Sequence, residues 1–344
     1  MNSSSAFDIN QQSNIRVSKV RASTGTAIAL GLSSGKVDAL PTTAYLMTYK
    51  GGKCTANCRF CAQARDSTAR ADMLSRVSWL VFKTSGVVES LKRTFCEGRT
   101  RRVCIQALNY AGVFADLACL VRSVRKEMDI PISVSCQPLE DKNISELANA
   151  GMERIGIPLD AATEDIFEKI KGKSAGSPYR WDNQFRLLAE AVRILGNNRV
   201  STHLIVGLGE SEQEMVETIQ RVVDLRVLPA LFAFTPIPGT NLENEVRPAL
   251  CVYRRLQLAR WAIVNGIACY KKMTFDRDGC LVDFGVSNQT FASLLDDGDA
   301  FRTSGCPGCN RPFYNDRPRG PFYNYPQKLS QKDIFTAKTQ LGMQ

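Results

Sequence analysis

Histidine is nearly absent from this sequence: His203 is the single histidine in 344 residues. Zinc sites usually take four Cys and His ligands in paired spacings, so this scarcity disfavours a mixed zinc site. Runs of about eighteen or more apolar residues are also absent, which excludes a membrane-spanning helix. The first residues, MNSSSAFDINQQSN, lack the basic and apolar regions of a secretory signal. We therefore expect a soluble, cytoplasmic protein with no membrane partner.

Cysteine, by contrast, is abundant, with twelve in the chain. In a protein without a secretory signal, cysteines stay reduced and serve as metal ligands or as small core residues. Cys96, Cys119, Cys251 and Cys269 lie in apolar or helical contexts, and we expect them to be core residues. The formal net charge of +10 favours an acidic partner, such as an anionic cofactor or an acidic carrier protein. Because the basic residues are dispersed, nucleic acid is not expected as a partner.

The segment Cys54-Thr-Ala-Asn-Cys58-Arg-Phe-Cys61 carries the clearest chemical signal. Its C-x3-C-x2-C spacing on a short loop can point three thiolates at one centre. This donor set suits a cubic iron–sulfur cluster whose fourth iron has no protein ligand, and that open iron is available for chemistry. Phe60, just before the last cysteine, strengthens the pattern. The alternatives are a zinc site and a chance spacing.

From about residue 42 the sequence alternates apolar β-branched runs with amphipathic helical stretches, as β/α units do. The strands are expected at residues 43–49, 103–109, 132–137, 155–159, 200–206 and 231–234. Helices are expected at residues 87–97, 114–128, 164–171 with 181–195, and 253–265. Two further helices are expected from their capping boxes: one begins at Asn143, with Glu146 three residues later, and the other at Ser211, with Glu214 three residues later.

Six such units predict an α/β fold, a partial TIM-like (β/α)6 barrel with functional groups at the carboxyl ends of its strands. The expected domains are an N-terminal segment, 1–41, that is partly disordered, the barrel, 42–268, and an irregular C-terminal extension, 269–344. Residues 302–326 of the extension are dense in Pro, Gly, Arg and Tyr and contain Cys306-Pro-Gly-Cys309. A loop ordered on a metal or against the barrel mouth is favoured over disorder or half of a zinc ribbon, for which a second C-x-x-C is missing.

A C-x3-C-x2-C loop after the first strand of such a barrel resembles the radical S-adenosylmethionine superfamily, and the resemblance covers about residues 40–265. It implies that Cys54, Cys58 and Cys61 bind a [4Fe-4S] cluster. The amine and carboxylate of S-adenosylmethionine would chelate its open iron. A 5′-deoxyadenosyl radical then abstracts hydrogen from an unactivated carbon. The resemblance also implies an electron donor such as ferredoxin or flavodoxin.

Two further segments resemble the biotin synthase and lipoyl synthase group of that superfamily. Ile205-Val-Gly207-Leu-Gly-Glu210 resembles the fifth-strand motif that packs beside the adenine of the cofactor. Asp160 resembles the fourth-strand acid that binds the ribose hydroxyls, with the first turn of a helix as its alternative role. His203 stands where the motif has a glycine, and a structural role is expected for it.

Biotin synthase itself places ligands of a second cluster where this chain has Cys104 and Cys136, but the third ligand falls near Ser201. We therefore interpret Cys104 and Cys136 as barrel-interior residues. The tail instead resembles the split lipoyl synthases, in which two related radical proteins act together. This resemblance implies an auxiliary [4Fe-4S] cluster on Cys280, Cys306 and Cys309.

The fourth ligand of that cluster would be Ser304, since Arg302-Thr-Ser304 is similar to the Arg-Ser-Ser motif of single-chain lipoyl synthases. Those enzymes carry their auxiliary cysteines before the barrel, whereas residues 1–41 here contain none. An oxygen ligand binds iron more weakly than a thiolate, so Ser304 could leave when a sulfide attacks a carbon radical. Arg302, Cys269 and the substrate are further possibilities for the fourth ligand.

The resulting hypothesis is sulfur insertion into an octanoyl chain on a lysine of a carrier domain or peptide, with a sister radical protein as partner. Arg311, Arg317 and Arg319 are candidates for a basic rim that faces an acidic carrier. One alternative is another biotin synthase-like radical reaction in cofactor biosynthesis. The other is a non-catalytic iron–sulfur or zinc scaffold protein. Which carbon receives sulfur, and what rebuilds a consumed cluster, are left open by the sequence.

Overall fold

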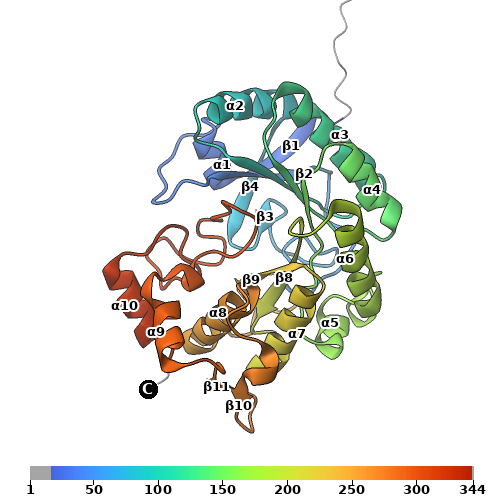
Figure 1. Cartoon of the computed structure of the whole chain (residues 1–344). Helices are drawn as coiled ribbons and strands as arrows, with labels where there is room; N and C mark the ends of the chain where they lie inside the picture. The colour runs from blue at the N-terminus through green and yellow to red at the C-terminus, as the bar shows by residue number, and fades with distance from the viewer. Residues whose placement is uncertain (1–16, 343–344) are drawn as a thin grey trace, which may run out of the picture.

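A curled sheet of parallel strands forms the centre of the protein, and helices wrap its outer side (Figure 1). The computed structural model describes residues 17–342, so the first part of the segment expected to be disordered lies outside the described residues. Six neighbouring strands run parallel: β2 (Thr43–Thr48), β5 (Arg102–Gln106), β6 (Ile132–Ser135), β7 (Arg154–Gly156), β8 (Val200–Val206) and β9 (Leu228–Ala233). The predicted partial barrel is confirmed.

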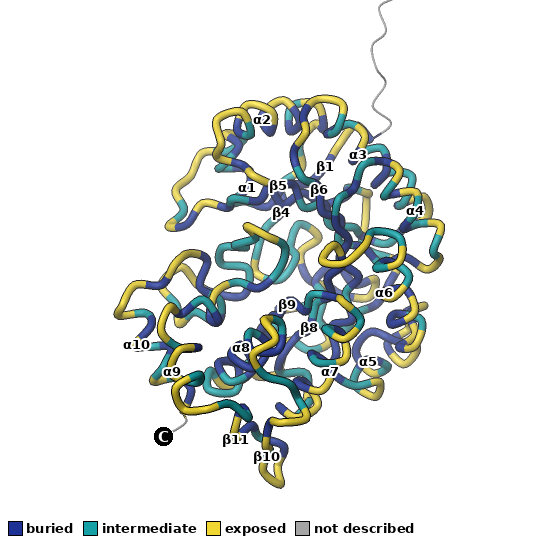
Figure 2. The backbone as a smooth tube through the Cα atoms, in the orientation of Figure 1, coloured by how far each residue is buried: buried dark blue, intermediate teal, exposed yellow. Residues whose placement is uncertain are grey.

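The helices between the strands cover the convex face of the sheet. They are α2 (Thr84–Cys96), α3 (Val113–Glu127), α4 (Asp141–Asn149), α5 (Glu164–Ile170), α6 (Trp181–Leu195), α7 (Glu212–Asp224) and α8 (Leu250–Val264). Figure 2 shows the strands buried and the outer sides of the helices exposed. A parallel sheet must be covered in this way because each crossover returns along its face. None of the helices in residues 17–342 is both long enough and apolar enough to cross a bilayer.

The two capping boxes predicted from the sequence have different outcomes. The Ser211 side chain accepts a hydrogen bond from the Glu214 backbone N–H, and the Glu214 side chain accepts one from the Ser211 N–H, so this box is confirmed. The box at Asn143 is wrong. Helix α4 already begins at Asp141, with Glu140 in the N-cap position and no side-chain cap, so Asn143 lies inside the first turn.

An antiparallel extension of the sheet was not predicted. Strand β1 (Lys19–Ser23) pairs with β2 on one side and with β4 (Val77–Lys83) on the other, and β3 (Met73–Leu74) forms the outer edge. The short helix α1 (Thr24–Ala29) follows β1. Strand β1 carries two basic residues in five, which hides it from a hydrophobicity pattern. It is stabilised by partners distant in sequence, and local propensity does not report such pairing.

The C-terminal extension first leaves the barrel and then returns to it. It contains the hairpin β10 (Thr274–Phe275) and β11 (Leu281–Asp283) and the helices α9 (Asn288–Asp296) and α10 (Gln331–Thr339). Short 3₁₀ turns occur at Lys173–Ala175, Tyr270–Lys272 and Asp299–Phe301. Between α9 and α10, residues 302–326 pack into the open side of the barrel.

Side chains and backbone on both edges of the sheet hold this returning segment, here called the tail loop (302–326). On one edge, the Leu231 N–H of β9 donates to Ser304 Oγ at 2.8 Å. On the other, Ser75 Oγ, beside β3, donates to the Tyr314 carbonyl at 3.0 Å. The fully buried Arg254 of α8 donates to the Tyr323 carbonyl at 2.8 Å. The tail loop therefore closes the gap between the two edges and lies against the barrel lumen.

Candidate functional site

The barrel lumen is a cavity of about 240 Å³. Its wall combines the cysteine loop after β2, inward side chains of the six parallel strands, and the tail loop. Cys54, Cys58 and Cys61 line it, as do Phe60, Asp160 and Ile205 from the set predicted to bind the cofactor. The cavity therefore brings together the three loop cysteines with residues of the fourth and fifth parallel strands, as a site at the carboxyl ends of barrel strands requires.

Hydrogen bonds from backbone N–H groups fix the cysteine loop. The Cys54 N–H donates to the Gln63 carbonyl at 2.9 Å, and the Cys61 N–H donates to the Cys58 carbonyl at 3.0 Å. The Asn109 N–H, after β5, donates to Cys54 Sγ at 3.2 Å. Backbone N–H groups that donate to sulfur in this way are typical around the sulfur ligands of clusters.

The loop thiols sit in an environment that disfavours bare thiolates. Burial raises the pKa of the Cys61 thiol to about 12. Burial also raises the pKa of Cys58, and the nearby Lys171 ammonium opposes that rise. Without a cation these thiols therefore hold their protons, and a bound metal centre displaces them. Three half-buried thiols on one fixed loop fit a three-cysteine cluster. Among residues 17–342, no three His, Cys, Asp or Glu side chains converge as ligands of a single ion.

Asp160 forms a buried ion pair that the sequence analysis missed. Its carboxylate lies 2.5 Å from Lys171 Nζ, and both side chains are at most 10 % exposed. Lys171, at the end of α5, also donates to the Pro158 carbonyl. Asp160 has a φ of 69°, a conformation that aspartate tolerates better than most residues. It holds this shape because its N–H donates to the His203 carbonyl at 2.7 Å.

The remaining members of the fifth-strand motif shape a turn and do not line the cavity. Glu210 accepts hydrogen bonds from the backbone N–H groups of Gly207 at 2.6 Å and Leu208 at 2.9 Å. Gly207 has a φ of 100°, and a Cβ there would lie 2.8 Å from Pro248. Both residues therefore stabilise the loop that follows Ile205, and any effect on the cofactor passes through that loop.

The tail loop brings Cys306 and Cys309 into the same cavity, where they meet Cys104 of β5. Burial raises the pKa of Cys104, and the neighbouring Cys306 and Cys309 thiols raise it further. Cys280 is not brought to this group. It lies in the β10–β11 hairpin, and the charged groups around it are Asp276, Glu212, Arg255 and Asp278. The Ser304 hydroxyl is engaged by the edge of β9 and does not line the cavity.

Some of the remaining predicted residues lie where they were expected, and others do not. Cys136 is buried and lines the cavity, as expected for a barrel-interior residue. Cys96, expected in the core, is exposed because it ends α2 on the solvent side. Arg311, expected at the rim, lies inside the cavity, with its guanidinium 3.8 Å from the Phe232 ring centroid. Arg317 and Arg319 are exposed.

His203 behaves as the structural residue that was expected. Its ring packs on Phe232 with the centroids 4.8 Å apart. Burial first, and then the positive charges of Arg311 and Lys171, lower the pKa of His203 from 6.5 to about 3. The imidazole is therefore neutral in the folded protein near neutral pH.

This neutral histidine predicts an acid-dependent loss of stability. The unfolded chain binds a proton at His203 below pH 6.5, whereas the folded chain binds it only near pH 3. The free energy of unfolding should therefore fall as the pH drops from 6.5, and His203 should contribute about 1.5 kcal/mol of that fall by pH 5. Urea unfolding of the apoprotein at the two pH values measures the fall. His203→Gln should lose that much less than wild type, and equal losses would contradict the assignment.

Comparison with known proteins adds three findings. A family described as "Radical SAM superfamily" matches residues 48–222, just over half of the chain. Biotin synthase from Sulfurihydrogenibium sp. (strain YO3AOP1) is 25% identical over 221 residues, covering 60% of each protein. Biotin synthase from Halorhodospira halophila is 30% identical over 204 residues, covering 58% of each. The chain thus matches about 60% of the length of these curated relatives.

Solved structures share the fold at low sequence identity. Methylornithine synthase (PylB) superposes with a TM-score of 0.50 at 12% identity, covering 65% of this chain and 62% of that one. The [FeFe]-hydrogenase maturase HydG superposes with a TM-score of 0.50 at 11% identity, covering 66% of this chain and 51% of that one. These likenesses bear on the barrel architecture alone.

Proposed function

The chain belongs to the radical SAM superfamily, and from that premise we propose that it inserts sulfur into an octanoyl chain carried on a lysine, acting with a sister protein of the same superfamily. The observation that supports this proposal is that two groups of thiols line one cavity. Cys54, Cys58 and Cys61 form one group, and Cys306 and Cys309 belong to the other. Sulfur insertion requires a radical source and a sulfur source within reach of the same carbon, and one shared cavity meets that requirement.

The first group is proposed to hold the radical-generating cluster. When bound there, a reduced [4Fe-4S] cluster with S-adenosylmethionine supplies the carbon radical that abstracts hydrogen from the substrate. Two buried acceptors in the same wall, Gln63 Oε1 and Gln137 Oε1, have no hydrogen-bond partner among the described residues. Such acceptors suit a ligand that brings ammonium or hydroxyl donors, as S-adenosylmethionine does. Asp160, with Lys171 behind it, offers a further carboxylate to the ribose hydroxyls.

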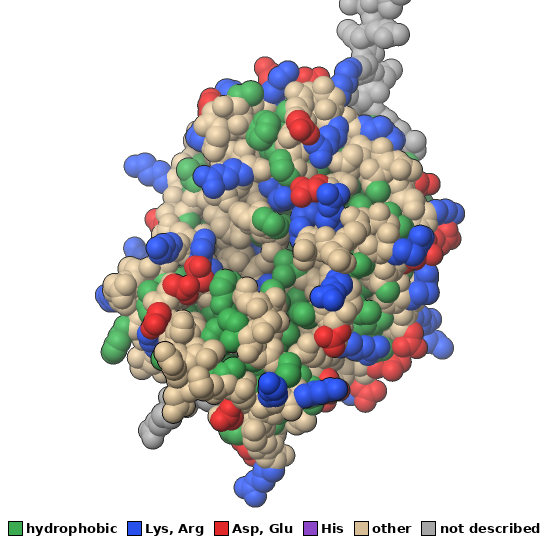
Figure 3. Space-filling view, viewed as in Figure 1, with side chains coloured by type: hydrophobic (Ala, Val, Ile, Leu, Met, Phe, Trp, Pro, Cys, Tyr) green, Lys and Arg blue, Asp and Glu red, His purple; other side chains and the backbone are tan. Residues whose placement is uncertain are grey.

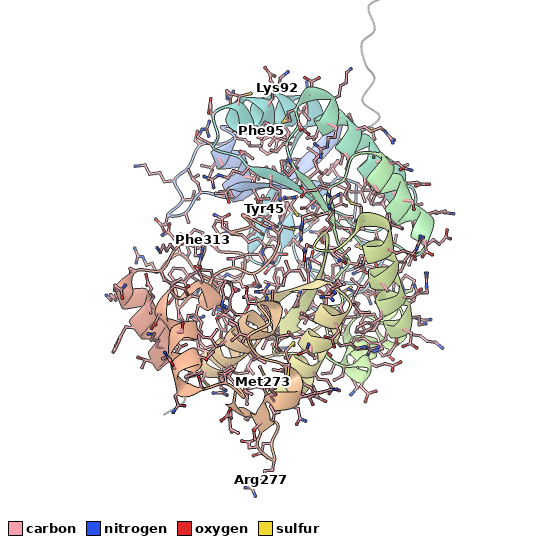
Figure 4. The ribbon with its side chains drawn as sticks, in the orientation of Figure 1. Tyr45, Lys92, Phe95, Met273, Arg277 and Phe313 are labelled. Atoms are coloured by element: carbon pink, nitrogen blue, oxygen red, sulfur yellow. The ribbon has the colours of Figure 1, made fainter. Side chains whose placement is uncertain are left out.

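A second cavity, of about 330 Å³, adjoins the first and offers a path for an acyl chain. The two cavities share Tyr45, Gln106, Arg311 and Tyr314. The wall of the second also contains apolar side chains, among them Val37, Trp79 and Phe313. Figure 4 shows Phe313 and Tyr45 near one another, between the α2 side and the α10 side of the molecule. Apolar walls favour the acyl chain over a polar substrate.

Arginines border the outer side of this region and suit an acidic carrier. Arg76, Arg247 and Arg317 line a cavity of about 340 Å³. Burial lowers the pKa of Arg76, and the charges of Arg317 and Arg247 lower it further. The Asp316 carboxylate, 3.6 Å from Arg247 Nη2, offsets part of this repulsion. Figure 3 shows Lys and Arg side chains spread over the visible face of the molecule, with Asp and Glu side chains among them. The rim proposed from the sequence thus keeps Arg317 and gains Arg76 and Arg247.

The proposal is tested with the purified chain and its sister protein under anaerobic conditions. S-adenosylmethionine, a reductant and an octanoyl-lysyl peptide are added, and the peptide mass is followed. The expected product carries two sulfur atoms, with 5′-deoxyadenosine formed alongside. A peptide of unchanged mass, although S-adenosylmethionine is cleaved, would reject octanoyl sulfuration.

A second candidate is another biotin synthase-like radical reaction in cofactor biosynthesis. Two observations favour it: the curated relatives described above are named biotin synthase, and Cys104 and Cys136 both line the cavity. In that case the substrate is a free small molecule, and no carrier is needed. The Arg76→Glu/Arg317→Glu variant distinguishes the two candidates. It should lower the turnover of a carrier-bound substrate at least about tenfold and leave the turnover of a free small substrate unchanged.

A further inference from the structure

Three neighbouring strands present polar side chains to the lumen at one level. In the sheet register Tyr45 of β2 is the partner of Cys104 in β5, and Cys104 is the partner of Ser133 in β6. All three side chains line the cavity. Adjacent strands lie about 4.8 Å apart, so the three positions span about 10 Å with Cys104 in the middle.

The tail loop places one cysteine on each side of Cys104. Cys309 Sγ lies 3.3 Å from the Tyr45 hydroxyl. Cys306 Sγ accepts a hydrogen bond from Ser133 Oγ at 3.5 Å. The Cys309 N–H donates to the Cys306 carbonyl at 2.9 Å, which fixes the two cysteines in one turn. The three thiols therefore form a group built from β5 and the tail loop.

Each of the two tail-loop cysteines, Cys306 and Cys309, lies beside a hydroxyl group. The oxygen of that hydroxyl already accepts a hydrogen bond from an arginine. The Arg311 backbone N–H donates to the Tyr45 hydroxyl oxygen at 2.8 Å, so the phenol hydrogen is available to Cys309 Sγ. In the same way, Arg102 Nη1 donates to Ser133 Oγ at 3.0 Å, and the Ser133 hydrogen is directed to Cys306. Tyr45 and Ser133 are both buried. Hydroxyls oriented in this way stabilise thiolates, which are the metal-binding form of cysteine.

A positive charge faces the same group without a full set of partners. Arg311 lines the cavity, and its buried Nε has no hydrogen-bond partner among the described residues. Burial raises the pKa of Cys309, and the Arg311 guanidinium opposes that rise. Arg311 also donates to the Ser304 carbonyl, which holds it in place. A cation whose buried Nε has no partner fits an anionic group, and a cluster on three thiolates is such a group.

Cys280 has a different environment, and it does not face these thiols. Its N–H donates to Asp276 Oδ1 at 2.9 Å. The adjacent Leu281 N–H donates to Glu212 Oε2 at 3.1 Å, at the start of α7. Figure 4 shows Arg277, from the same hairpin, at the bottom tip of the molecule, whereas Tyr45 lies in the interior of the upper half.

We propose that Cys104, Cys306 and Cys309 are the protein ligands of a second iron–sulfur cluster inside the barrel, and that Cys280 is not a ligand. A cubic four-iron cluster on three cysteines has one iron without a thiolate ligand. The Arg311 side chain lines the same cavity as the three cysteines. The tail loop then has a defined task, which is to carry two of three ligands through the open side of the barrel. The ligand set stands whichever substrate the enzyme uses.

Iron and sulfide content after anaerobic reconstitution tests the assignment. Wild type should hold about eight irons per chain, and Cys104→Ala/Cys306→Ala/Cys309→Ala should hold about four. Cys280→Ala and Cys136→Ala are matched controls, the first for the tail cysteine that lies elsewhere and the second for another cysteine of the same lumen. Both should keep about eight irons. The proposal would be overturned if Cys280→Ala lost about four irons while Cys104→Ala kept the wild-type iron content. It would also be overturned if the protein held one zinc in place of the second set of irons.

Tyr45→Phe provides a second readout that does not depend on the folding of a multiple cysteine variant. It removes the hydroxyl that lies beside Cys309 Sγ and that also accepts the Arg311 N–H. Hydrogen bonds to cluster sulfurs stabilise the reduced state, so the reduction potential of the second cluster should become more negative while the iron content stays at the wild-type value. A potential equal to that of wild type, measured by a redox titration followed by electron paramagnetic resonance, would contradict the contact. Because both readouts are independent of substrate, a failure here is distinguishable from a failure of octanoyl sulfuration.

Discussion

Replacing Cys54, Cys58 and Cys61 with alanine should abolish the formation of 5′-deoxyadenosine from S-adenosylmethionine. These three thiols are held on one loop in the lumen, and no other described cysteines stand in a C-x3-C-x2-C spacing. Without them the radical-generating cluster has no protein ligands, so turnover should fall to the rate without enzyme. Chromatography of 5′-deoxyadenosine under strong reduction measures the effect.

The matched control for that variant removes three cysteines outside the cavity. Cys96, Cys119 and Cys251 are absent from the lumen wall, and their replacement by alanine should leave both 5′-deoxyadenosine formation and iron content near wild type. The loop variant should also lose about four irons. Retention of S-adenosylmethionine cleavage by the loop variant would show that the radical centre lies elsewhere.

The second large effect is expected at the buried ion pair. Lys171→Met leaves the Asp160 carboxylate in the cavity wall without its partner, and the removal of one member of a buried pair costs about 3–5 kcal/mol. Urea unfolding of the apoprotein should show a loss of that size in the free energy of unfolding. Measuring the apoprotein keeps cluster binding out of the comparison.

The double variant Lys171→Met/Asp160→Asn separates the pair from general damage to the site. Replacing both charges removes the unpaired carboxylate, so most of the lost stability should return. If the double variant is as unstable as Lys171→Met, the loss comes from packing around the lysine stem or from the bond to the Pro158 carbonyl, and the ion pair contributes little.

The parts of the molecule that the sequence predicted are those with local signals. Strand β2 and the cysteine loop follow one another, so an apolar run and a fixed spacing were enough to place both. The capping box at Ser211 is contained in four residues. The strand β1 was missed because its partners are β2 and β4, and antiparallel pairing across that separation leaves no trace in a short window.

The second thiol group shows the same limit at the site. Cys104 and Cys306 lie about two hundred residues apart, and they meet only because the tail loop fills the open side of the barrel. A partial signal was present, since Tyr45, Cys104 and Ser133 place polar side chains at inward positions of three parallel strands. Strands buried on both faces are usually apolar throughout, so polar residues at such positions indicate a lined cavity. No sequence pattern predicted the burial of Lys171. Its burial depends on the ion pair with Asp160, which forms only when the end of α5 packs beside that residue.

The most direct test of the account is the transfer of deuterium from the substrate to the cofactor product. An octanoyl-lysyl peptide with a fully deuterated acyl chain is incubated with this chain, S-adenosylmethionine, a reductant and a sister protein whose own radical-site cysteines are replaced by alanine. The account predicts deuterium in 5′-deoxyadenosine, because the abstraction takes place in the lumen of this chain. Unlabelled 5′-deoxyadenosine from an active enzyme would contradict it, since the radical would then form without reaching the octanoyl chain.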